Sequence, residues 1–324
     1  MRRLIYSFYL FACLSVVVAQ TSSRTPEGSR PLRVMSWNVE NLFDTIHDEG
    51  FRDEEFLPTS ERRWTGGRYW RKLTDVSRVV AAVADDGGVP DLIGLCEVEN
   101  DSVMTTLCRR SVLRQMEYSY VMTHSEDERG IDVALLYQPV HFRLLDSRSI
   151  RVPSRQQGLR PTRDFLYVKG LVLTGNGVDT LHVIVVHLPS RAGGREGDKN
   201  RHLAARRLWE VVDSIQGTDG AQMVVMGDFN ADARDRIFKH APLRLTDDRH
   251  EAGTYSFRGY WQWIDHILVS PSIDVPSPAR PVKLPWLLEE NKTYGGQMPR
   301  RTFRGPAYHG GTSDHLPLLL DLLF

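Results

Sequence analysis

Eight short stretches of the chain carry runs of apolar and β-branched side chains, and each is bounded by turn-forming residues. This pattern predicts short strands separated by tight connections. The stretches are residues 32–40, 91–99, 132–139, 165–175, 180–189, 221–230, 263–270 and 316–324. Together they indicate a domain that is rich in β-strands from residue 32 onward.

Two longer stretches repeat apolar residues every three or four positions, which is the spacing of an amphipathic helix. The first lies within residues 68–88, and we expect Gly87 to end it. The second covers residues 198–217, with Asp198 as the expected N-cap and Gly217 as the expected stop.

Many strands and two main helices favour one α/β domain, in which two β-sheets pack face to face with helices outside. A parallel doubly wound sheet is the alternative fold. It fits the pattern less well, because it needs a helical crossover after each strand, and helices do not follow every predicted strand.

The N-terminal segment differs from the rest of the chain. Arg2 and Arg3 precede an apolar stretch at residues 4–18, and small residues stand three and one positions before Gln20. This pattern is typical of a secretory signal peptide, here residues 1–19, which is too short for a stable membrane span. Residues 20–31 are polar and rich in Ser, Pro and Gly, as in a linker, so we expect the folded domain to occupy residues 32–324.

A bacterial lipoprotein leader is a second interpretation of the same segment, because residues 10–13 resemble a lipoprotein box. In that case Cys13 would carry the acyl anchor. Both interpretations predict a secreted or periplasmic protein, and neither leaves a transmembrane segment once the leader is removed.

Charge and cysteine content narrow the function classes. The chain has 41 basic and 41 acidic residues, so binding to a polyanion must come from local patches rather than from net charge. Only Cys96 and Cys108 follow the leader, too few for a disulfide framework in a domain of this size. Cys96 lies in an apolar run, and we expect it to be a buried thiol.

Polar side chains gather at or near the ends of the predicted strands. Any one of them alone is best read as a strand-end residue that hydrogen-bonds a turn, but strands that converge at one rim would bring them into one cleft. Carboxylate and amide oxygens suit Mg²⁺, and histidines beside carboxylates suit proton transfer. The residues are Asn38, Glu40, Glu97, Glu99, Asp132, His187, Asp228, Asn230, Asp265, His266, Asp314 and His315.

Six motifs in this order resemble those of the endonuclease/exonuclease/phosphatase superfamily, which has the fold of DNase I. They are "SWNVENLFD", "LCEVEN", "HLPSR", "GDFNAD", "IDHILVS" and "TSDHLPL". The resemblance covers residues 32–324. It implies a four-layer α/β sandwich of two mixed β-sheets and Mg²⁺-dependent cleavage of phosphate esters. Mn²⁺ is an alternative ion, and a structural Ca²⁺ stays open.

The resemblance also implies roles for individual residues. Asn38 and Glu97 correspond to metal-binding positions, and Asp314 to a carboxylate close to the metal. Asp228 and Asn230 correspond to the pair that positions the attacking water and contacts the scissile phosphate.

Further roles concern proton transfer and phosphate binding. His315 corresponds to the catalytic histidine, a general base, and Asp265 to the acid that orients it. His187 corresponds to a second, phosphate-facing histidine, and Asp132 lies near the position of the acid that pairs with it. The resemblance makes Arg163 a phosphate-contacting arginine, and we expect the same of Arg191 because it closely follows His187.

Two insertions bear on the substrate. Residues 44–71 and 280–312 mix charged side chains with aromatic ones, which suits a nucleic acid with stackable bases. The alternative is solvated loops whose aromatic side chains pack beneath them. We expect a secreted, monomeric Mg²⁺-dependent nuclease that acts as an endonuclease on DNA. The alternatives are a sphingomyelinase-like phosphodiesterase on lipid head groups, a phosphomonoesterase, and a non-catalytic binding module on the same fold.

Overall fold

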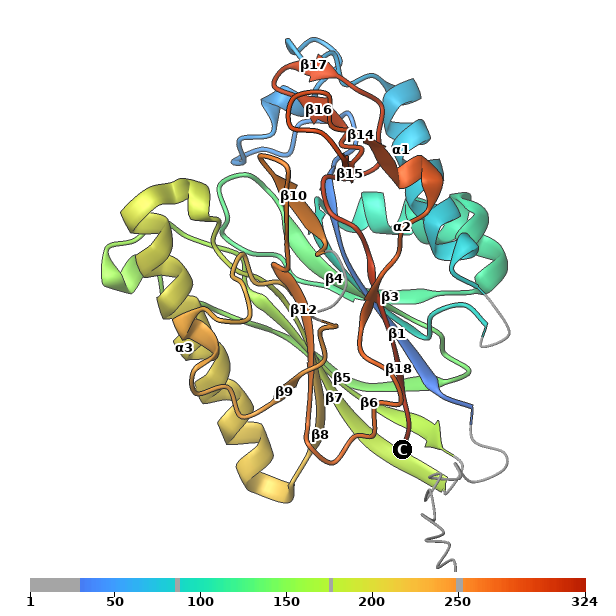
Figure 1. Ribbon diagram of the computed structural model, residues 1–324, viewed down its shortest axis with the longest axis vertical. Helices are drawn as coiled ribbons and strands as arrows, with labels where there is room; N and C mark the ends of the chain where they lie inside the picture. The colour runs from blue at the N-terminus through green and yellow to red at the C-terminus, as the bar shows by residue number, and fades with distance from the viewer. Residues whose placement is uncertain (1–29, 85–87, 175–176, 249–252) are drawn as a thin grey trace, which may run out of the picture.

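The computed structural model describes residues 30–84, 88–174, 177–248 and 253–324. The predicted signal peptide, Cys13 and Gly87 lie outside the described residues. The described chain forms four layers, in which two sheets pack against each other and helices cover their outer faces (Figure 1). The predicted four-layer sandwich is therefore confirmed.

The first sheet has six strands and is mixed. Only β1 and β2 run parallel, and the other neighbours are antiparallel. The order is β13 (Arg280–Pro281), β18 (Leu318–Leu322), β1 (Leu32–Leu42), β2 (Leu92–Val98), β4 (Asp132–Tyr137) and β3 (Ser119–Met122).

The second sheet is also mixed and six-stranded, with β7 and β8 as its parallel pair. The order is β5 (Phe142–Ile150), β6 (Phe165–Thr174), β7 (Gly177–His187), β8 (Gln222–Asp228), β12 (Asp265–Val269) and β9 (Arg244–Leu245). The alternative of one parallel doubly wound sheet is wrong, because each sheet holds a single parallel pair among antiparallel neighbours.

Three small hairpins lie apart from these sheets. They are β10 (Tyr255–Phe257) with β11 (Tyr260–Gln262), β14 (Leu288–Glu290) with β15 (Gln297–Pro299), and β16 (Phe303–Arg304) with β17 (Ala307–Tyr308). The last two belong to the insertion at residues 280–312, which lies at one end of the molecule beside the segment before α1 (Figure 1).

Helices α1 (Gly66–Ala82) and α2 (Asp101–Arg110) pack on the first sheet, and α3 (Gly194–Asp219) packs on the second. The short 3-10 turns are η1 (Glu54–Phe56), η2 (Val112–Met116), η3 (Arg155–Gln157), η4 (Arg191–Gly193), η5 (Arg236–Phe238) and η6 (Pro285–Leu287). Within the described ranges, no helix is both long and apolar enough to span a bilayer.

The helix ends differ from the sequence predictions. Helix α1 already ends at Ala82, before Gly87. Helix α3 begins at Gly194, so the assignment of Asp198 as N-cap is wrong. It also runs past Gly217 to Gly220, where a left-handed φ of 62° ends it, as is common for glycine at a helix C-terminus.

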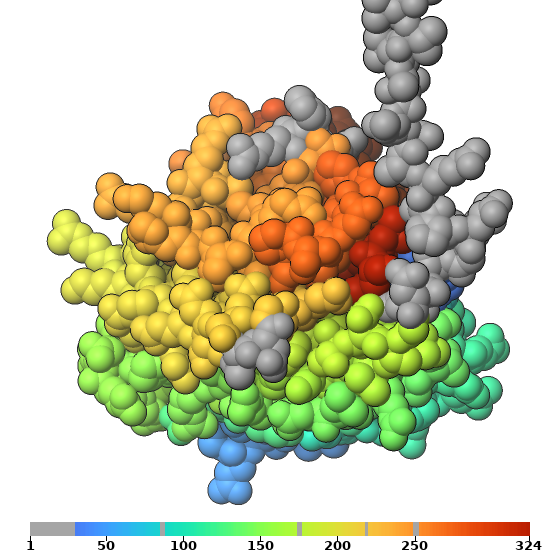
Figure 2. All heavy atoms as spheres, turned by 90° about the horizontal axis from the view of Figure 1, so that it is seen from below, coloured from blue at the N-terminus to red at the C-terminus, as the bar shows by residue number. Residues whose placement is uncertain are grey.

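The two faces of β1 explain the layers. Leu32 and Val34 face the second sheet, whereas Met35 and Trp37 pack among the side chains of α1 and α2. This alternation follows from the two-residue period of a strand. The sheets pack so closely that a Cβ on Gly94 would lie 2.7 Å from the sulfur of Met226. Figure 2 shows the result from below as one continuous body.

Cys96 is fully buried between the sheets, as predicted, and both Cys96 and Cys108 are free thiols. Part of the aromatic content of the two insertions is also core. Trp64 is fully buried, with its ring centroid 5.7 Å from that of Phe303. For these two side chains the packed-loop alternative holds.

Candidate active site

A cleft of about 590 Å³ opens where strands of the two sheets end. Parallel neighbours present their carboxyl ends at the same edge, so β1 with β2 and β7 with β8 each contribute side chains there. The predicted site residues that line the cleft are Asn38, Glu97, Arg163, His187, Arg191, Asp228, Asn230, Asp314 and His315.

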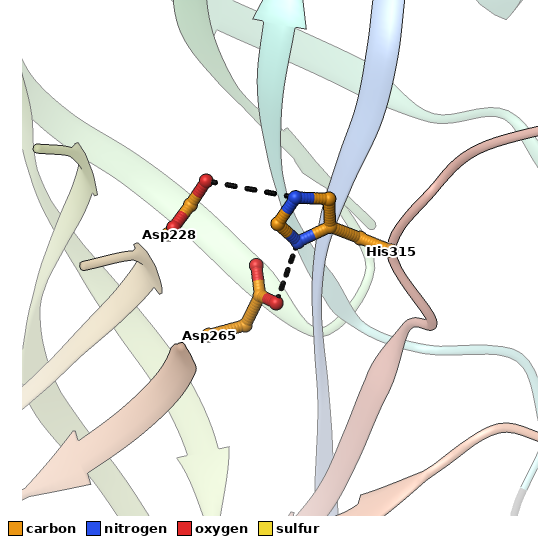
Figure 3. Close-up of side chains that lie close together, drawn as sticks. All are labelled: Asp228, Asp265 and His315. Carbon is orange, nitrogen blue, oxygen red and sulfur yellow. Dashed lines mark hydrogen bonds and ion pairs between the residues drawn. The ribbon is translucent and has the colours of Figure 1, made fainter. Parts of the chain in front are cut away.

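His315 and Asp265 form a hydrogen-bonded pair behind the wall of this cleft (Figure 3). Nδ1 of His315 lies 2.7 Å from Oδ2 of Asp265, which also accepts a hydrogen bond of 2.5 Å from the hydroxyl of Thr254. Nδ1 of His315 donates a hydrogen bond to the carboxylate of Asp265. The other ring nitrogen, Nε2, therefore faces Asp228 and the cleft.

The segment before β18 holds His315 in place. The indole N–H of Trp37 donates to the carbonyl of His315 at 3.0 Å. The hydroxyl of Ser313 donates to the carbonyl of Asn38 at 2.7 Å and accepts from the amide of His315 at 3.0 Å. The ring of Tyr255 packs on the imidazole with centroids 5.0 Å apart. These contacts fix the direction of the imidazole.

The charges around His315 set its protonation. Burial alone would lower the pKa of His315, but Asp265, and after it Asp228 and Asp314, raise it well above the ordinary value. In the metal-free protein the imidazole is therefore protonated at neutral pH.

His187 is the opposite case. Burial, and then the charges of Arg163 and Arg129, lower its pKa well below the ordinary value, so the imidazole is neutral. Its Nε2 lies 3.6 Å from Oδ2 of Asp228 and 3.8 Å from Oε1 of Glu97. The two histidines of the cleft thus differ in charge, as expected for different tasks.

Asp228 occupies the centre of the site. Its carboxylate accepts from the side-chain amide of Asn38 at 3.1 Å and from the backbone amide of Asn230 at 2.8 Å. Burial, and next the charge of Asp265, raise the pKa of Asp228 to about 7. Without a cation, burial and the neighbouring carboxylate of Asp265 therefore disfavour a negative charge on Asp228.

Backbone irregularities direct two of the side chains. The ladders of β2 with β1 and with β4 both shift register near Glu97, which has a left-handed φ of 64°. Asn230 has a φ of 49°. Bulges re-aim side chains, and non-glycine residues in this region are strained by about 1–3 kcal/mol each. Such strain is typical of functional sites.

The donors in the cleft fit a hard divalent cation. Oxygen and nitrogen atoms of Asp228, Asp265 and His315 lie within 4.8 Å of one another, so these three form a candidate metal site. Glu97 and Asp314 add carboxylates on the cleft side. Carboxylate oxygens are the ligands that Mg²⁺ prefers, and a cation would offset the charge that raises the pKa of Asp228.

The two predicted phosphate-binding arginines lie at the cleft. Arg163 is buried, donating to Asp127 at 3.1 Å and to the carbonyl of Leu188 at 3.0 Å. Arg191 is exposed and donates from Nε to the carbonyl of Asn230 at 2.9 Å. Both guanidinium groups face the same space as His187.

Asp132 does not pair with His187, which corrects the sequence prediction. The loop after β3 supplies nearer donors, and the carboxylate of Asp132 accepts from the hydroxyl of Thr123 at 2.6 Å and the amide of Ser125 at 3.0 Å. Nδ1 of His187 has no hydrogen-bond partner among the described residues.

The sequence prediction missed residues that complete the cleft wall. They are Asn41, Arg129, Ser190, Ala192, Tyr255, Phe257, Gln262, Ile264 and Arg301, and the predicted strand-end residue Glu40 lines the cleft beside them. Arg301 comes from the insertion at residues 280–312 and donates to Asp314 at 2.6 Å. The basic residues of that insertion were the available signal, but only the fold shows which of them enters the cleft.

A buried lysine supports this wall. Nζ of Lys72 donates to the carbonyl of Glu40, to the hydroxyl of Thr302 at 2.6 Å and to the carbonyl of Thr312 at 3.0 Å. The carboxylate of Glu40 accepts from the amide of Thr302 at 2.7 Å. Lys72 thus joins α1, the end of β1 and the segment that carries His315.

Solved structures share this fold at low sequence identity. The human Nocturnin catalytic domain with bound sulfate is 20% identical, with a TM-score of 0.56 and coverage of 91% of this chain and 95% of that chain. Truncated Caenorhabditis elegans TDP2 is 18% identical, with a TM-score of 0.58 and coverage of 91% and 98%. A mannosyl-6-phosphatase of Bacteroides thetaiotaomicron is 16% identical, with a TM-score of 0.57 and coverage of 90% and 100%. No match to this chain is found among curated proteins.

The sequence profile of the Endonuclease/Exonuclease/phosphatase family matches residues 33–323. The match spans both sheets and the cleft between their edges. The buried Asp228, Asp265 and His315 cluster lies within it. This chain therefore belongs to the endonuclease/exonuclease/phosphatase family, with the DNase I-like fold and the cleft of a phosphoesterase.

Proposed function

We propose that this protein is a Mg²⁺-dependent phosphodiesterase that cleaves DNA as an endonuclease. The observation that carries the proposal is the buried pair of Asp265 and His315, whose free Nε2 faces a cleft that also holds the neutral His187. An acid–histidine pair can accept a proton from water, and a second, neutral imidazole can donate a hydrogen bond to a phosphoryl oxygen.

The cleft residues have different roles in the hydrolysis. His315 takes a proton from the attacking water as its oxygen bonds to phosphorus, while the bond to the leaving ester oxygen breaks. Asp265 keeps the proton on Nδ1 and stabilises the imidazolium that forms. His187 and Asn230 donate hydrogen bonds to the phosphoryl oxygens.

Asp265 and His315 are hydrogen-bonded to each other and serve in proton transfer, so of the buried cluster only Asp228 would lie beside the cation. Glu97, Asp314 and Asn38 are the residues that would hold it. A bound Mg²⁺ supplies positive charge that stabilises the phosphate oxygens and counters the field that keeps His315 protonated. Mn²⁺ suits the same oxygen donors.

One face of the β10–β11 hairpin supports a substrate with flat bases. Tyr255 and Phe257 lie on the same side of β10, and Phe257 pairs with Tyr260 across the hairpin. Phe257 lines the cleft and is 50% exposed, while Tyr260 is 77% exposed. Exposed aromatic rings next to a phosphate site suit nucleobases, which stack with about 1–3 kcal/mol per base.

Supercoiled plasmid tests the proposal directly. With Mg²⁺ we expect nicked and then linear products, and with EDTA none. Bis-p-nitrophenyl phosphate and sphingomyelin serve as parallel substrates. Hydrolysis of the small diester without any loss of plasmid would reject the nuclease, and release of phosphocholine would favour the lipid phosphodiesterase.

The leader gives the proposed location. We propose export from the cytoplasm, with cleavage before Gln20. Mass spectrometry of the mature N-terminus distinguishes this from acylation of Cys13.

A further inference from the structure

A second cavity of about 470 Å³ adjoins the active-site cleft. The two share four lining residues, which are Arg129, Arg163, Ser190 and Ala192. The second cavity, here called the arginine groove, continues past them along Arg160 and Thr162 to the start of α3. A strand whose phosphate lies at His187 therefore has a path into this groove.

Basic groups gather around the arginine groove. Arg52, Arg129, Arg160 and Arg163 all line it. Helix α3 is 26 residues long, and its N-cap Gly193 lines the groove together with Glu196 and Gly197 of its first turn. The N-terminus of a helix is favourable for an anion, because its amide groups are not used within the helix.

Three acidic residues also line the groove: Asp127 holds Arg163 in a buried ion pair at 3.1 Å, whereas Glu128 and Glu196 lie beside exposed arginines. Arg52 lies 3.1 Å from Glu128, and Arg160 lies 3.9 Å from Glu196. The side chains of Arg52 and Arg160 are 72% and 75% exposed, so these pairs are weak and their guanidinium groups can turn to a ligand.

Two buried polar groups on the wall lack a partner. Among the residues that the structure describes, the hydroxyl of Thr162 and Nε of Arg163 have no hydrogen-bond partner, although these residues are only 5% and 7% exposed. Buried polar groups are normally paired, so an unpaired hydroxyl on a cavity wall is informative. Thr162 and Arg163 both line the arginine groove.

We propose that the arginine groove is a second phosphate subsite, which binds the phosphate next to the scissile one in a nucleic acid strand. The inference rests on the proposed nuclease function. It adds that the enzyme recognises at least two consecutive phosphates, with Arg160 and Thr162 as the residues that read the second.

Binding of a short fluorescent thymidine oligonucleotide in EDTA tests this without turnover. Arg160→Gln and Thr162→Val should each raise Kd about five- to tenfold, and Arg160→Gln should reduce the salt dependence by about one counterion. Arg206→Gln is the matched control, because Arg206 is an exposed arginine of α3 that does not line the groove and pairs only weakly with Glu210. It should bind as the wild type does.

A second oligonucleotide carries neutral methylphosphonate linkages at alternate positions. Each substitution should raise the Kd for this oligonucleotide by a smaller factor, because the phosphate charge that Arg160 and Thr162 would contact is absent. If both variants bind the unmodified oligonucleotide as tightly as the wild type does, the subsite is rejected. It is also rejected if each variant loses the same affinity for the unmodified and for the methylphosphonate oligonucleotide. Displacement of the oligonucleotide by tripolyphosphate at equal concentration would assign the groove to small polyphosphates and overturn a strand-specific role.

Cleavage of the same oligonucleotide with Mg²⁺ separates this inference from the proposed function. Cleavage by a protein whose binding ignores Arg160→Gln and Thr162→Val rejects the subsite and keeps the nuclease. Binding that depends on both residues, without cleavage, rejects the nuclease and keeps the phosphate subsite. A wild type that neither binds nor cuts rejects both.

Discussion

Asp265 and His315 stand 50 positions apart in the sequence, yet Oδ2 of one and Nδ1 of the other are 2.7 Å apart in a buried site. Asp265 belongs to β12 in the second sheet, and His315 precedes β18 in the first. The pair therefore bridges the two sheets, and its geometry depends on how they pack. Nε2 of His315 lies 3.9 Å from carboxylate oxygens of Asp228 and Asp314, and His315 lines the cleft.

Replacement of His315 by alanine should stop turnover without unfolding the protein. Loss of a general base typically lowers the rate by ~10²–10⁴-fold, and the strands of both sheets stay paired through their backbones. Hydrolysis of bis-p-nitrophenyl phosphate gives kcat, and circular dichroism monitors folding. His202→Ala, at an exposed position of α3, is the control and should keep wild-type activity. Near-normal turnover of His315→Ala would assign the base elsewhere.

The two glutamates of the "LCEVEN" motif should differ in Mg²⁺ binding. Glu97 lines the cleft, whereas Glu99 lies outside its lining and accepts from the amide of Asp44 at 2.6 Å. Burial raises the pKa of Glu99 to about 9, so glutamine replaces a carboxyl that is already neutral. Glu97→Gln removes a charged ligand instead.

Thermal unfolding with and without Mg²⁺ measures this difference. A ligand at 100 times its Kd stabilises a protein by about 2.7 kcal/mol, so the wild type and Glu99→Gln should gain about that much. Glu97→Gln should gain little at the same concentration. Equal Mg²⁺ stabilisation of all three proteins would remove Glu97 from the cation site.

Asp132 should affect the pH dependence of stability rather than catalysis. Burial raises its pKa from 3.8 to about 6, so the folded protein holds this proton more tightly than the unfolded chain. The stability that the proton contributes is complete below about pH 4 and is lost as the pH rises through about 6. Asp132→Asn is neutral throughout, and its amide oxygen can accept from Thr123 and Ser125.

Urea unfolding at two pH values tests the sign. At pH 4 we expect Asp132→Asn and the wild type to be about equally stable, and at pH 7 the variant should be more stable by about 1–3 kcal/mol. Turnover should stay comparable to that of the wild type. A variant with intact stability but no activity would restore the catalytic role that the sequence predicted for Asp132.

Much of the fold could be predicted because its strands are buried and their apolar runs are local signals. Strand β5 was missed because most of its side chains are exposed, so it lacks such a run. Helix α2 was missed because only Val103, Met104, Leu107 and Cys108 are buried in its ten residues. The first turn of α3 was missed because Gly194 and its neighbours are exposed and show no apolar period.

The site could be predicted in part for a similar reason. Asn38, Glu97, His187 and Asp228 lie at strand ends, and parallel pairing brings those ends together. The contact of Lys72 with Thr312 joins positions 240 residues apart. This contact follows from the packing of α1 on the first sheet, and no local sequence pattern predicts it.

Lys72→Met should weaken both stability and catalysis. Methionine keeps the length of the side chain, but it leaves the carbonyls of Glu40 and Thr312 without their buried donor. Each unsatisfied buried acceptor costs about 1–3 kcal/mol, so we expect a loss of about 2–4 kcal/mol in the free energy of unfolding. Because Thr312 lies three residues before His315, kcat should fall as well.

Arg78→Met on the same helix is the control for this last prediction. The Arg78 side chain is 57% exposed and lies 3.6 Å from Asp75, so its replacement should cost less than about 1 kcal/mol and leave kcat unchanged. Urea unfolding and hydrolysis of bis-p-nitrophenyl phosphate measure the two effects. If Lys72→Met unfolds at the wild-type urea concentration, the buried ammonium group is not what holds the segment before His315 against β1, and the hydrogen bonds of the Ser313 hydroxyl suffice.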